Sequence, residues 1–410
     1  MKYGLLGKKL GHSYSKIIHE AFAPYEYELL ELTEEELDSF MKAHDFCAVN
    51  VTIPYKETVM KYLDFIDDTA RQIGAVNTVV NNDGVLYGYN TDFYGLRSLL
   101  VKNGFELFGK KVLILGSGGT SKTAQAVCYS LGCGEIHVVS RSGEVNYENV
   151  LALHSDAAYI INTTPCGMYP QNEGQALSLS GFEKLEGVAD VIYNPLRTNL
   201  LLEAKERKIK YCGGLYMLVL QAVKASELFL SREFPENTGM DVYRKLISQK
   251  ENIVLIGMPG SGKSTIGKLL AKELAREFVD IDELIIKSAG MEITEIFSKY
   301  GEPYFRDLET KAVKETSKMT GLVVATGGGA VLRRENVAAL MQNGKIFFLD
   351  RPLSQIMPTS DRPLSSDEQA LKKRFDERYP IYRSTCDETV FVDGIPEHAV
   401  SAIIGKGVAK

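Results

Sequence analysis

A lysine and an aspartate in the first hundred residues have the chemistry needed to reduce a carbonyl group. Lys56 ends the polar run 50–56 and Asp92 ends the run 88–92, while Ser13 lies in a third hydroxyl-rich cluster. A lysine held by a carboxylate can pass a proton to the alkoxide that develops as hydride arrives. Taken separately, Ser13 or Asp92 could simply cap a helix. Together the clusters predict a reductase site.

A nucleotide-binding turn follows these clusters. The strand expected at 110–115 runs into a glycine-rich turn that opens a helix over about 121–131, although Ser121 replaces the third glycine of the strict dinucleotide motif. The next strand, 136–139, ends at Arg141 instead of the acidic residue that binds the ribose of NAD. Arg141 could be an ordinary surface arginine, but an arginine flanked by hydroxyls suits a 2′-phosphate. We therefore predict NADP(H), bound by Gly116, Ser117, Gly118, Gly119, Thr120, Ser140, Arg141 and Ser142.

A second nucleotide site is predicted at residues 257–264, which match the phosphate-loop pattern G-x-x-x-x-G-K-[ST]. An apolar strand, 253–256, precedes the loop, and helical spacing follows it. Glycines let successive N–H groups surround phosphates, the lysine adds positive charge, and the serine hydroxyl is a Mg²⁺ ligand. We predict ATP, bound by Gly257, Gly260, Ser261, Gly262, Lys263, Ser264 and Thr265.

Acidic and basic residues after this loop predict the rest of a kinase site. Asp280 and Asp282 are expected on a strand over 277–282, where the period of two directs both the same way. Asp280 would then reach Mg²⁺ through water, and Asp282 would orient and deprotonate a substrate hydroxyl; a helix cap is the alternative for Asp282. Arg306 lies three residues before Glu309, which also fits a plain salt bridge. An acidic substrate and ATP would be met by the positive charges of Lys263, Arg306, Arg362 and Arg378.

Composition indicates a soluble, cytoplasmic α/β protein of more than one domain. The chain has 410 residues, 45% of them hydrophobic, and a net charge of −6 with both signs interspersed, which argues against nucleic acid or a membrane surface as partner. The partners expected are small-molecule substrates. Six cysteines form no C-x-x-C pair or zinc ligand set, and no signal peptide or membrane span is apparent.

The pattern of strands and helices predicts three domains. Strands at 3–7, 27–32 and 46–53 alternate with a helix at 14–22 and with a Thr33-capped helix that ends at about Ala43. We expect an α/β substrate domain over 1–105, completed by a returning helix at about 215–247, and a Rossmann-type NADP domain over 106–214. A P-loop domain with a parallel sheet is expected over 251–410.

The first part of the chain, residues 1–247, resembles shikimate dehydrogenase. The matching motifs are His12-Ser13-x-Ser15, Asn50-Val51-Thr52-x-Pro54-x-Lys56, Gly74-Ala75-Val76-Asn77-Thr78, Gly88-x-Asn90-Thr91-Asp92, the Gly116 turn, Asn162-Thr163-Thr164-x-x-Gly167-Met168 and Met217-Leu218-Val219-x-Gln221-Ala222. The resemblance implies that Lys56 and Asp92 are the catalytic pair and that Tyr193 and Gly213 approach substrate or nicotinamide. It implies that the substrate is held by Ser13, Ser15, Thr52, Asn77 and Gln221.

The second part, residues 251–410, resembles shikimate kinase. The phosphate loop, Asp280-x-Asp282, Gly301-Glu302-x-x-Phe305-Arg306-x-x-Glu309, Gly327-Gly328-Gly329, Arg362-Pro363-Leu364 and Arg378-x-x-x-Tyr382 stand in the family's order. The resemblance implies that Arg362 comes from a mobile lid and stabilises the transferred phosphoryl group. It implies that shikimate is bound by Asp282, Arg306, Gly328, Gly329 and Arg378. The segment 351–361 is shorter than the helix and lid expected before the lid arginine.

Both resemblances together imply a bifunctional enzyme of aromatic biosynthesis. It would reduce 3-dehydroshikimate with NADPH and then phosphorylate the 3-hydroxyl of shikimate with Mg·ATP. Two alternatives stay open. The first part could be a quinate/shikimate oxidoreductase that uses NAD, and the second part could be a nucleotide-binding regulatory module that transfers no phosphoryl group.

Overall fold

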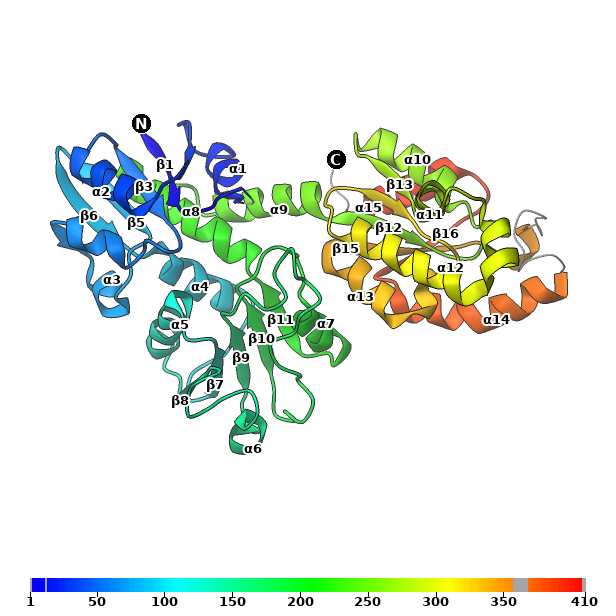
Figure 1. The fold of residues 1–410 in the computed structure, drawn as a ribbon, viewed down its shortest axis with the longest axis horizontal. Coiled ribbons are helices and arrows are strands. Elements are labelled where there is room, and N and C mark those ends of the chain that lie inside the picture. Colours follow the sequence, from blue (N-terminus) through cyan, green and yellow to red (C-terminus); the bar gives the residue numbers. More distant parts are fainter. Residues whose placement is uncertain (1, 12, 357–367, 408–410) are drawn as a thin grey trace. The chain divides into compact units, whose positions relative to one another are not determined.

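A computed structural model describes residues 2–11, 13–356 and 368–407 of the chain. The chain forms two compact units, Met1–Arg244 and Lys245–Lys410 (Figure 1). His12 and the segment 357–367, which includes Arg362, lie outside the described residues. The boundary between the units falls within helix α9 (Thr238–Lys250).

The first unit begins with a mixed sheet of six strands, ordered β2-β1-β3-β5-β6-β4. Strand β5 is antiparallel to both β3 and β6, whereas β1 is parallel to β2 and β3, and β4 is parallel to β6. The parallel half places the carboxyl ends of β1 and β3 at one edge, where polar residues follow. The strands are β1 (Tyr3–Gly7), β2 (Glu28–Glu31), β3 (Ala48–Val51), β4 (Phe65–Ile66), β5 (Thr78–Asn82) and β6 (Val85–Tyr89).

Helices with well-defined caps connect these strands. Thr33 forms a capping box with Glu36 at the start of α2 (Glu34–Ala43), as the sequence predicts for a Thr33-capped helix. Asp67 caps α3 (Asp68–Ile73), and Asn90 caps α4 (Thr91–Lys102). Helix α1 is Ser15–Glu20, shorter than the expected 14–22, and a 3₁₀ turn covers Thr58–Tyr62.

The second sheet of the first unit is fully parallel, with the strand order β11-β10-β9-β7-β8. Its strands have buried apolar cores on both faces, as a sheet covered by helices requires. The strands are β7 (Lys111–Leu115), β8 (Glu135–Val139), β9 (Tyr159–Asn162), β10 (Gly187–Asp190) and β11 (Lys210–Gly213). Helices α5 (Gly119–Ser130), α6 (Val150–His154) and α7 (Asn199–Glu206) connect them.

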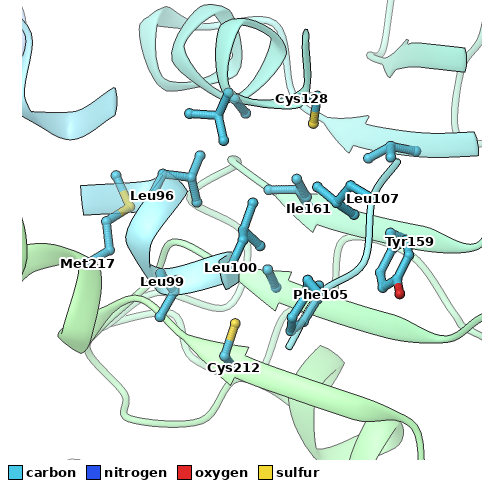
Figure 2. Packing of buried hydrophobic residues seen from close by; sticks show 14 of the residues in the cluster. Leu96, Leu99, Leu100, Phe105, Leu107, Cys128, Tyr159, Ile161, Cys212 and Met217 are labelled. Carbon is cyan, nitrogen blue, oxygen red and sulfur yellow. The ribbon is translucent and has the colours of Figure 1, made fainter. Parts of the chain in front are cut away.

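One hydrophobic cluster joins α4 and α8 (Leu215–Leu230) to the parallel sheet (Figure 2). Leu96, Leu99 and Leu100 of α4 lie among Ile161 of β9 and Cys128 of α5. Because α4 carries Asp92 and α8 carries Gln221, this cluster holds two helices of the predicted active site against the parallel sheet.

The expectation of one returning helix over 215–247 is wrong. The chain forms two helices, α8 and α9, because α8 ends at Ser231 in a left-handed conformation (φ 49°) and Pro235 follows shortly after. A left-handed residue terminates an α-helix, and a proline just beyond it cannot continue the helix.

The second unit contains a five-stranded parallel sheet, ordered β13-β14-β12-β15-β16. Hydrophobic clusters cover both faces of the sheet. The predicted fold class, an α/β substrate domain with a Rossmann-type domain and then a P-loop domain with a parallel sheet, is confirmed. The strands are β12 (Asn252–Ile256), β13 (Phe278–Asp280), β14 (Val323–Ala325), β15 (Gly344–Asp350) and β16 (Glu388–Phe391).

Six helices surround this sheet within the described residues. Helix α12 contains a kink at Gly301, whose φ of 81° and ψ of 172° are not helical. The helices are α10 (Lys263–Glu273), α11 (Ile281–Ala289), α12 (Ile293–Ser317), α13 (Arg334–Asn343), α14 (Glu368–Thr385) and α15 (Pro396–Gly405).

The core at α4 gives a first prediction. Leu100 is fully buried, whereas its neighbour Val101 is 50% exposed. Leu100→Ala should lower the free energy of unfolding by about 2–5 kcal/mol, since it removes buried methyl groups and leaves a cavity. Val101→Ala, the control, should change it by less than about 0.5 kcal/mol. Urea unfolding followed by circular dichroism measures both, and equal effects would contradict the assigned packing.

Candidate active sites

The first candidate site is centred on an ion pair between Lys56 and Asp92. Lys56 follows β3, and Asp92 is the second residue of α4. Lys56 Nζ donates to Asp92 Oδ2 at 2.5 Å, and the two side chains are only 20% and 14% exposed. The structure thus brings together two residues 36 positions apart, in a shielded place where a charge-assisted hydrogen bond is strong.

Asp92 is not the cap of its own helix. Asn90 Oδ1 accepts from Phe93 N at 3.2 Å, and Asn90 Nδ2 donates to Ala75 O at 2.9 Å. Since Asn90 satisfies the helix end, the carboxylate of Asp92 is left for Lys56. The capping explanation for Asp92 is therefore wrong.

A buried hydrogen-bond network next to this pair connects two predicted substrate residues, Asn77 and Gln221. Asn77 Oδ1 accepts from Thr91 N at 2.7 Å and from Thr78 Oγ1 at 3.1 Å. Thr91 Oγ1 donates to Gln221 Oε1 at 3.4 Å. Thr91 was not assigned a role from the sequence, although its place directly before Asp92 was a signal. It ties β5, α4 and α8 together at the site.

The serine loop before α1 contacts the turn after β10. Ser13 Oγ donates to Ser15 Oγ at 3.1 Å, and the ring of Tyr14 between them lies 5.4 Å from the ring of Tyr193, tilted by 51°. Burial raises the pKa of both tyrosines. Tyr14 was missed in the sequence because a tyrosine between two serines has no special pattern. Its contact places Tyr193 beside the predicted substrate serines.

Two further residues of the predicted site, Thr52 and Gly213, lie where another segment of the chain passes close to a glycine. The methyl group of Thr52 lies beside Gly7, where a Cβ would come within 2.7 Å of it. A Cβ on Gly213 would come within 2.8 Å of Leu196 O, so glycine lets β11 approach the turn that carries Tyr193. Gly213 thus packs against the backbone of Ile192 and Leu196, on either side of Tyr193 in the chain.

The backbone of the predicted NADP turn is open to an approaching ligand. Gly116 has a φ of 102°, which favours glycine, and α5 begins at Gly119 directly after the turn. A Cβ added at Gly118 or Gly119 would meet nothing within 4 Å. Arg141 and Ser142, after β8, are exposed. Backbone N–H groups at a helix start and an exposed arginine suit a phosphorylated dinucleotide, so these residues fit the cofactor.

A buried aspartate orders the turn that presents Tyr193. Asp190 Oδ1 accepts from Asn162 Nδ2 and from Ile192 N, both at 3.0 Å, and Asp190 Oδ2 accepts from Thr198 Oγ1 at 2.7 Å. Burial raises the pKa of Asp190 to about 6, although these hydrogen bonds oppose the shift. Asp190 had no assigned role, and its position at a strand end was the available signal.

In the second unit, the phosphate loop has the backbone shape that its glycines predict. Gly257, Gly260 and Gly262 all have positive φ, of 149°, 80° and 96°. Lys263 Nζ donates to Gly257 O at 3.0 Å and to Met258 O at 2.9 Å. Ser261 Oγ is buried and has no hydrogen-bond partner among the described residues. An unsatisfied hydroxyl inside a loop of this shape fits a phosphate group.

The two predicted metal residues are adjacent. Ser264 Oγ donates to Asp280 Oδ2 at 2.6 Å. A hydroxyl and a carboxylate are the oxygen ligands that Mg²⁺ prefers, directly or through water. The pair therefore fits a magnesium ion that accompanies ATP.

The expectation that Asp280 and Asp282 share a strand is wrong. Strand β13 ends at Asp280, and Asp282 lies in the first turn of α11. Asp280 Oδ1 accepts from Asp282 N at 3.0 Å and so caps this helix. The strand ends at Asp280 because its side chain bonds the backbone two residues on, which favours a helix start over a longer strand. The helix cap is therefore Asp280 and not Asp282. The period of two of a strand therefore does not set the relative direction of these two side chains.

Asp282 nevertheless reaches the glycine loop after β14, and Arg306 reaches the same loop. A Cβ on Gly327 would come within 2.9 Å of Asp282 Oδ1 and 2.6 Å of Glu309 Oε1. A Cβ on Gly329 would overlap the guanidinium of Arg306. Only glycine fits these places, and the loop therefore brings acidic and basic side chains from α11 and α12 to one point.

Arg306 is a buried cation held by two carboxylates. Its Nη1 lies 2.8 Å from Glu309 Oε2 and its Nη2 lies 2.9 Å from Glu302 Oε1. The salt bridge weighed as the alternative for Arg306 and Glu309 is therefore present, and it orients the guanidinium. Burial raises the pKa of Glu309 despite the opposing charge of Arg306.

Arg378 reaches the same region from α14. It is 7% exposed and hydrogen-bonds Tyr382, one turn further along the helix. Tyr382 Oη donates to Gly328 O, and burial raises the pKa of Tyr382 to about 12. Arg378, Gly328 and Tyr382 are thus linked, while the predicted lid residue Arg362 lies outside the described residues.

Family models match both units. A model described as shikimate dehydrogenase substrate binding domain matches residues 5–79, and one described as shikimate kinase matches residues 259–406. A relative from Clostridium beijerinckii named shikimate dehydrogenase (NADP(+)) is 38% identical over 59% of this chain and 96% of its own length.

Solved structures agree over the first unit. Shikimate dehydrogenase 1 from Peptoclostridium difficile is 35% identical with a TM-score of 0.56, covering 60% of this chain and 98% of its own. Shikimate 5-dehydrogenase from Thermus thermophilus, solved with NADP(H) and shikimate, is 29% identical with a TM-score of 0.53, covering 60% and 99%.

These findings define an oxidoreductase followed by a kinase domain. The chain belongs to the shikimate dehydrogenase family through its first unit and carries a shikimate kinase domain in its second. Both resemblances seen in the sequence are confirmed.

Other chemistry is not apparent in the described part of the chain. No group of three or more His, Cys, Asp or Glu side chains there forms a metal site of its own. All six cysteines are free thiols. No described helix has the length and apolar character needed to cross a membrane.

Asp190 gives a prediction on pH. Its pKa rises from 3.8 to about 6 on folding, so it stabilises the fold below about pH 4, and this contribution is lost as the pH rises to 6. Asp190→Asn cannot ionise. Relative to wild type, the variant should gain on the order of 2–3 kcal/mol of unfolding free energy between pH 4 and 6, and nothing further above 7. Urea unfolding across this range measures the difference; a constant difference would refute the raised pKa.

Proposed function

We propose that the chain catalyses two consecutive reactions. The first unit reduces 3-dehydroshikimate to shikimate with NADPH, and the second phosphorylates the 3-hydroxyl of shikimate with Mg·ATP. The Lys56–Asp92 pair, beside the network of Asn77 and Gln221, is the observation that carries the first assignment. The presence of a shikimate kinase domain on the same chain supports the second reaction as the next step.

In the proposed reduction, Lys56 donates the proton and Asp92 positions Lys56. NADPH, when bound, supplies the hydride. Lys56 Nζ hydrogen-bonds the substrate oxygen and donates a proton to it as negative charge develops, while Asp92 holds the ammonium in place. Ser13, Ser15, Thr52, Asn77 and Gln221 orient the substrate by its hydroxyl and carboxylate groups. Tyr193 and Gly213 border the reacting carbon.

The preference for NADP over NAD is proposed from the turn after β8. Arg141 is exposed there between two serines, and no acidic residue stands at the position that would bind a free ribose hydroxyl. A 2′-phosphate would gain a charge-assisted hydrogen bond from the guanidinium. An NAD-dependent oxidoreductase of the quinate type would instead have a carboxylate at this place, to bind the free hydroxyl of the ribose.

In the proposed phosphorylation, Asp282 orients the substrate hydroxyl and accepts its proton. Arg306 and Arg378 bind the carboxylate of shikimate, and the backbone of Gly328 and Gly329 lets the ring come close. Lys263 leaves the carbonyls of Gly257 and Met258 to neutralise the phosphates of ATP. Ser264 and Asp280 would hold a Mg²⁺ ion, which would supply further positive charge at the phosphates. Arg362 is proposed to stabilise the transferred phosphoryl group.

Lys56→Ala should abolish the reduction without affecting the kinase. Loss of the proton donor should lower kcat for 3-dehydroshikimate by about 10²–10⁴-fold. NADPH oxidation followed at 340 nm measures this. Lys61→Ala, an exposed lysine on the same segment, is the control. Unchanged turnover in Lys56→Ala would remove Lys56 from the mechanism.

Lys263→Ala should have the converse effect. Without its charge at the phosphates, shikimate-dependent ADP release should fall by at least about 10²-fold, while dehydrogenase turnover stays at the wild-type value. Lys268→Ala, an exposed lysine of the same helix, is the control. ATP binding by the wild type without any shikimate-dependent ADP would favour the regulatory-module alternative and refute the kinase proposal.

The two reactions are tested together by supplying 3-dehydroshikimate, NADPH and Mg·ATP to the full chain. The expected product is shikimate 3-phosphate, identified by mass spectrometry. Omitting ATP should leave shikimate, and omitting NADPH should leave the starting compound. Replacing NADPH by NADH should slow the reaction; equal rates would contradict the role of Arg141.

A further inference from the structure

The chain after β15 lies along the phosphate loop. A Cβ on Gly257 would come within 2.9 Å of Leu349 O, and a Cβ on Gly260 would come within 3.3 Å of Ile356 Cγ2. The residues between these two contacts, including the 3₁₀ turn Leu353–Gln355, therefore border the loop from the neighbouring strand. This segment contains one basic residue, Arg351, to which neither the motifs nor the family matches assign a role.

Arg351 rests on the phosphate loop through a single hydrogen bond. Its Nη1 donates to Gly260 O at 3.2 Å. Its Nε is buried and finds no acceptor among the described residues. A guanidinium carries five N–H donors, and a buried donor without a partner costs free energy comparable to a lost hydrogen bond. The arrangement keeps a cation beside the loop, and within the described residues only one of its hydrogen bonds is made.

A second orphaned group lies on the same loop. Ser261, directly after the Gly260 carbonyl that holds Arg351, has a fully buried hydroxyl that also finds no partner among the described residues. Two unsatisfied polar atoms at one loop point to a single ligand rich in acceptors. An anion is favoured, because Arg351 is a permanent cation and nothing in the loop segment 257–264 is acidic.

We propose that Arg351 is a nucleotide-binding residue that contacts the phosphate chain of ATP and ADP. This inference rests on the proposed kinase function and adds a cation to its nucleotide site. Gly260 O holds one end of the guanidinium so that the fork is already oriented when the nucleotide arrives. Arginine suits the task because its planar fork binds phosphate oxygens in pairs.

The test measures nucleotide binding by calorimetry on the full chain, with and without substitution of Arg351. Arg351→Ala should weaken Mg·ADP and Mg·ATP by about ten- to a hundredfold. Arg351→Lys should recover part of the loss, because it keeps the charge but not the fork. Adenosine, used as a probe without phosphates, should bind both variants as it binds the wild type. Arg383→Ala, an exposed arginine of the same unit, should change nothing.

Two results would overturn the inference. One is wild-type affinity of Arg351→Ala for Mg·ADP. The other is an equal loss of affinity for adenosine and for Mg·ADP, which would mean that Arg351 only stabilises the conformation of the loop. Phosphoryl transfer is assayed separately from nucleotide binding. A wild type that binds Mg·ATP but releases no ADP with shikimate would refute the kinase function. The role of Arg351 would then still be tested by the binding measurements on its variants. Dehydrogenase turnover should be equal in all variants.

Discussion

The amino end of helix α4 is the constraint on which the first site depends. The first N–H groups of a helix need acceptors from outside the helix, and Asn90 and Asn77 provide them through their side-chain oxygens. A side-chain amide is uncharged, so it can do this without competing for a lysine. Asp92, two positions after Asn90, is then the only carboxylate of that turn and is available to bind Lys56.

The second unit divides its acidic residues in a similar way. Asp280 serves the fold by capping α11 and also bonds Ser264 through its other oxygen. Asp282, in the turn that Asp280 caps, is directed to the glycine loop near Glu309 and Gly327. In both units the residue that caps the helix leaves the carboxylate two positions further on for the candidate site, and in the second unit the capping residue Asp280 also bonds Ser264 of the predicted metal site.

The sequence predicted the architecture because glycine turns and apolar strands are local signals. It placed β1 at its observed bounds and the cap of α2 at Thr33. It did not separate Asp280 from Asp282, because a strand end and a helix cap share the same residue types. The contact of Tyr14 with Tyr193 was also beyond reach, since it joins positions 14 and 193 through tertiary packing alone.

Continuity of the backbone through α9 has a consequence for metabolic control. Under the proposed function, each translated chain yields one reductase site and one kinase site, so the cell cannot adjust their ratio by expression or by selective degradation. For this chain, the balance between making shikimate and consuming it then depends on the kinetic constants of the two sites and on the levels of their substrates, NADPH and ATP among them. A change in the amount of the chain would change both rates by the same factor.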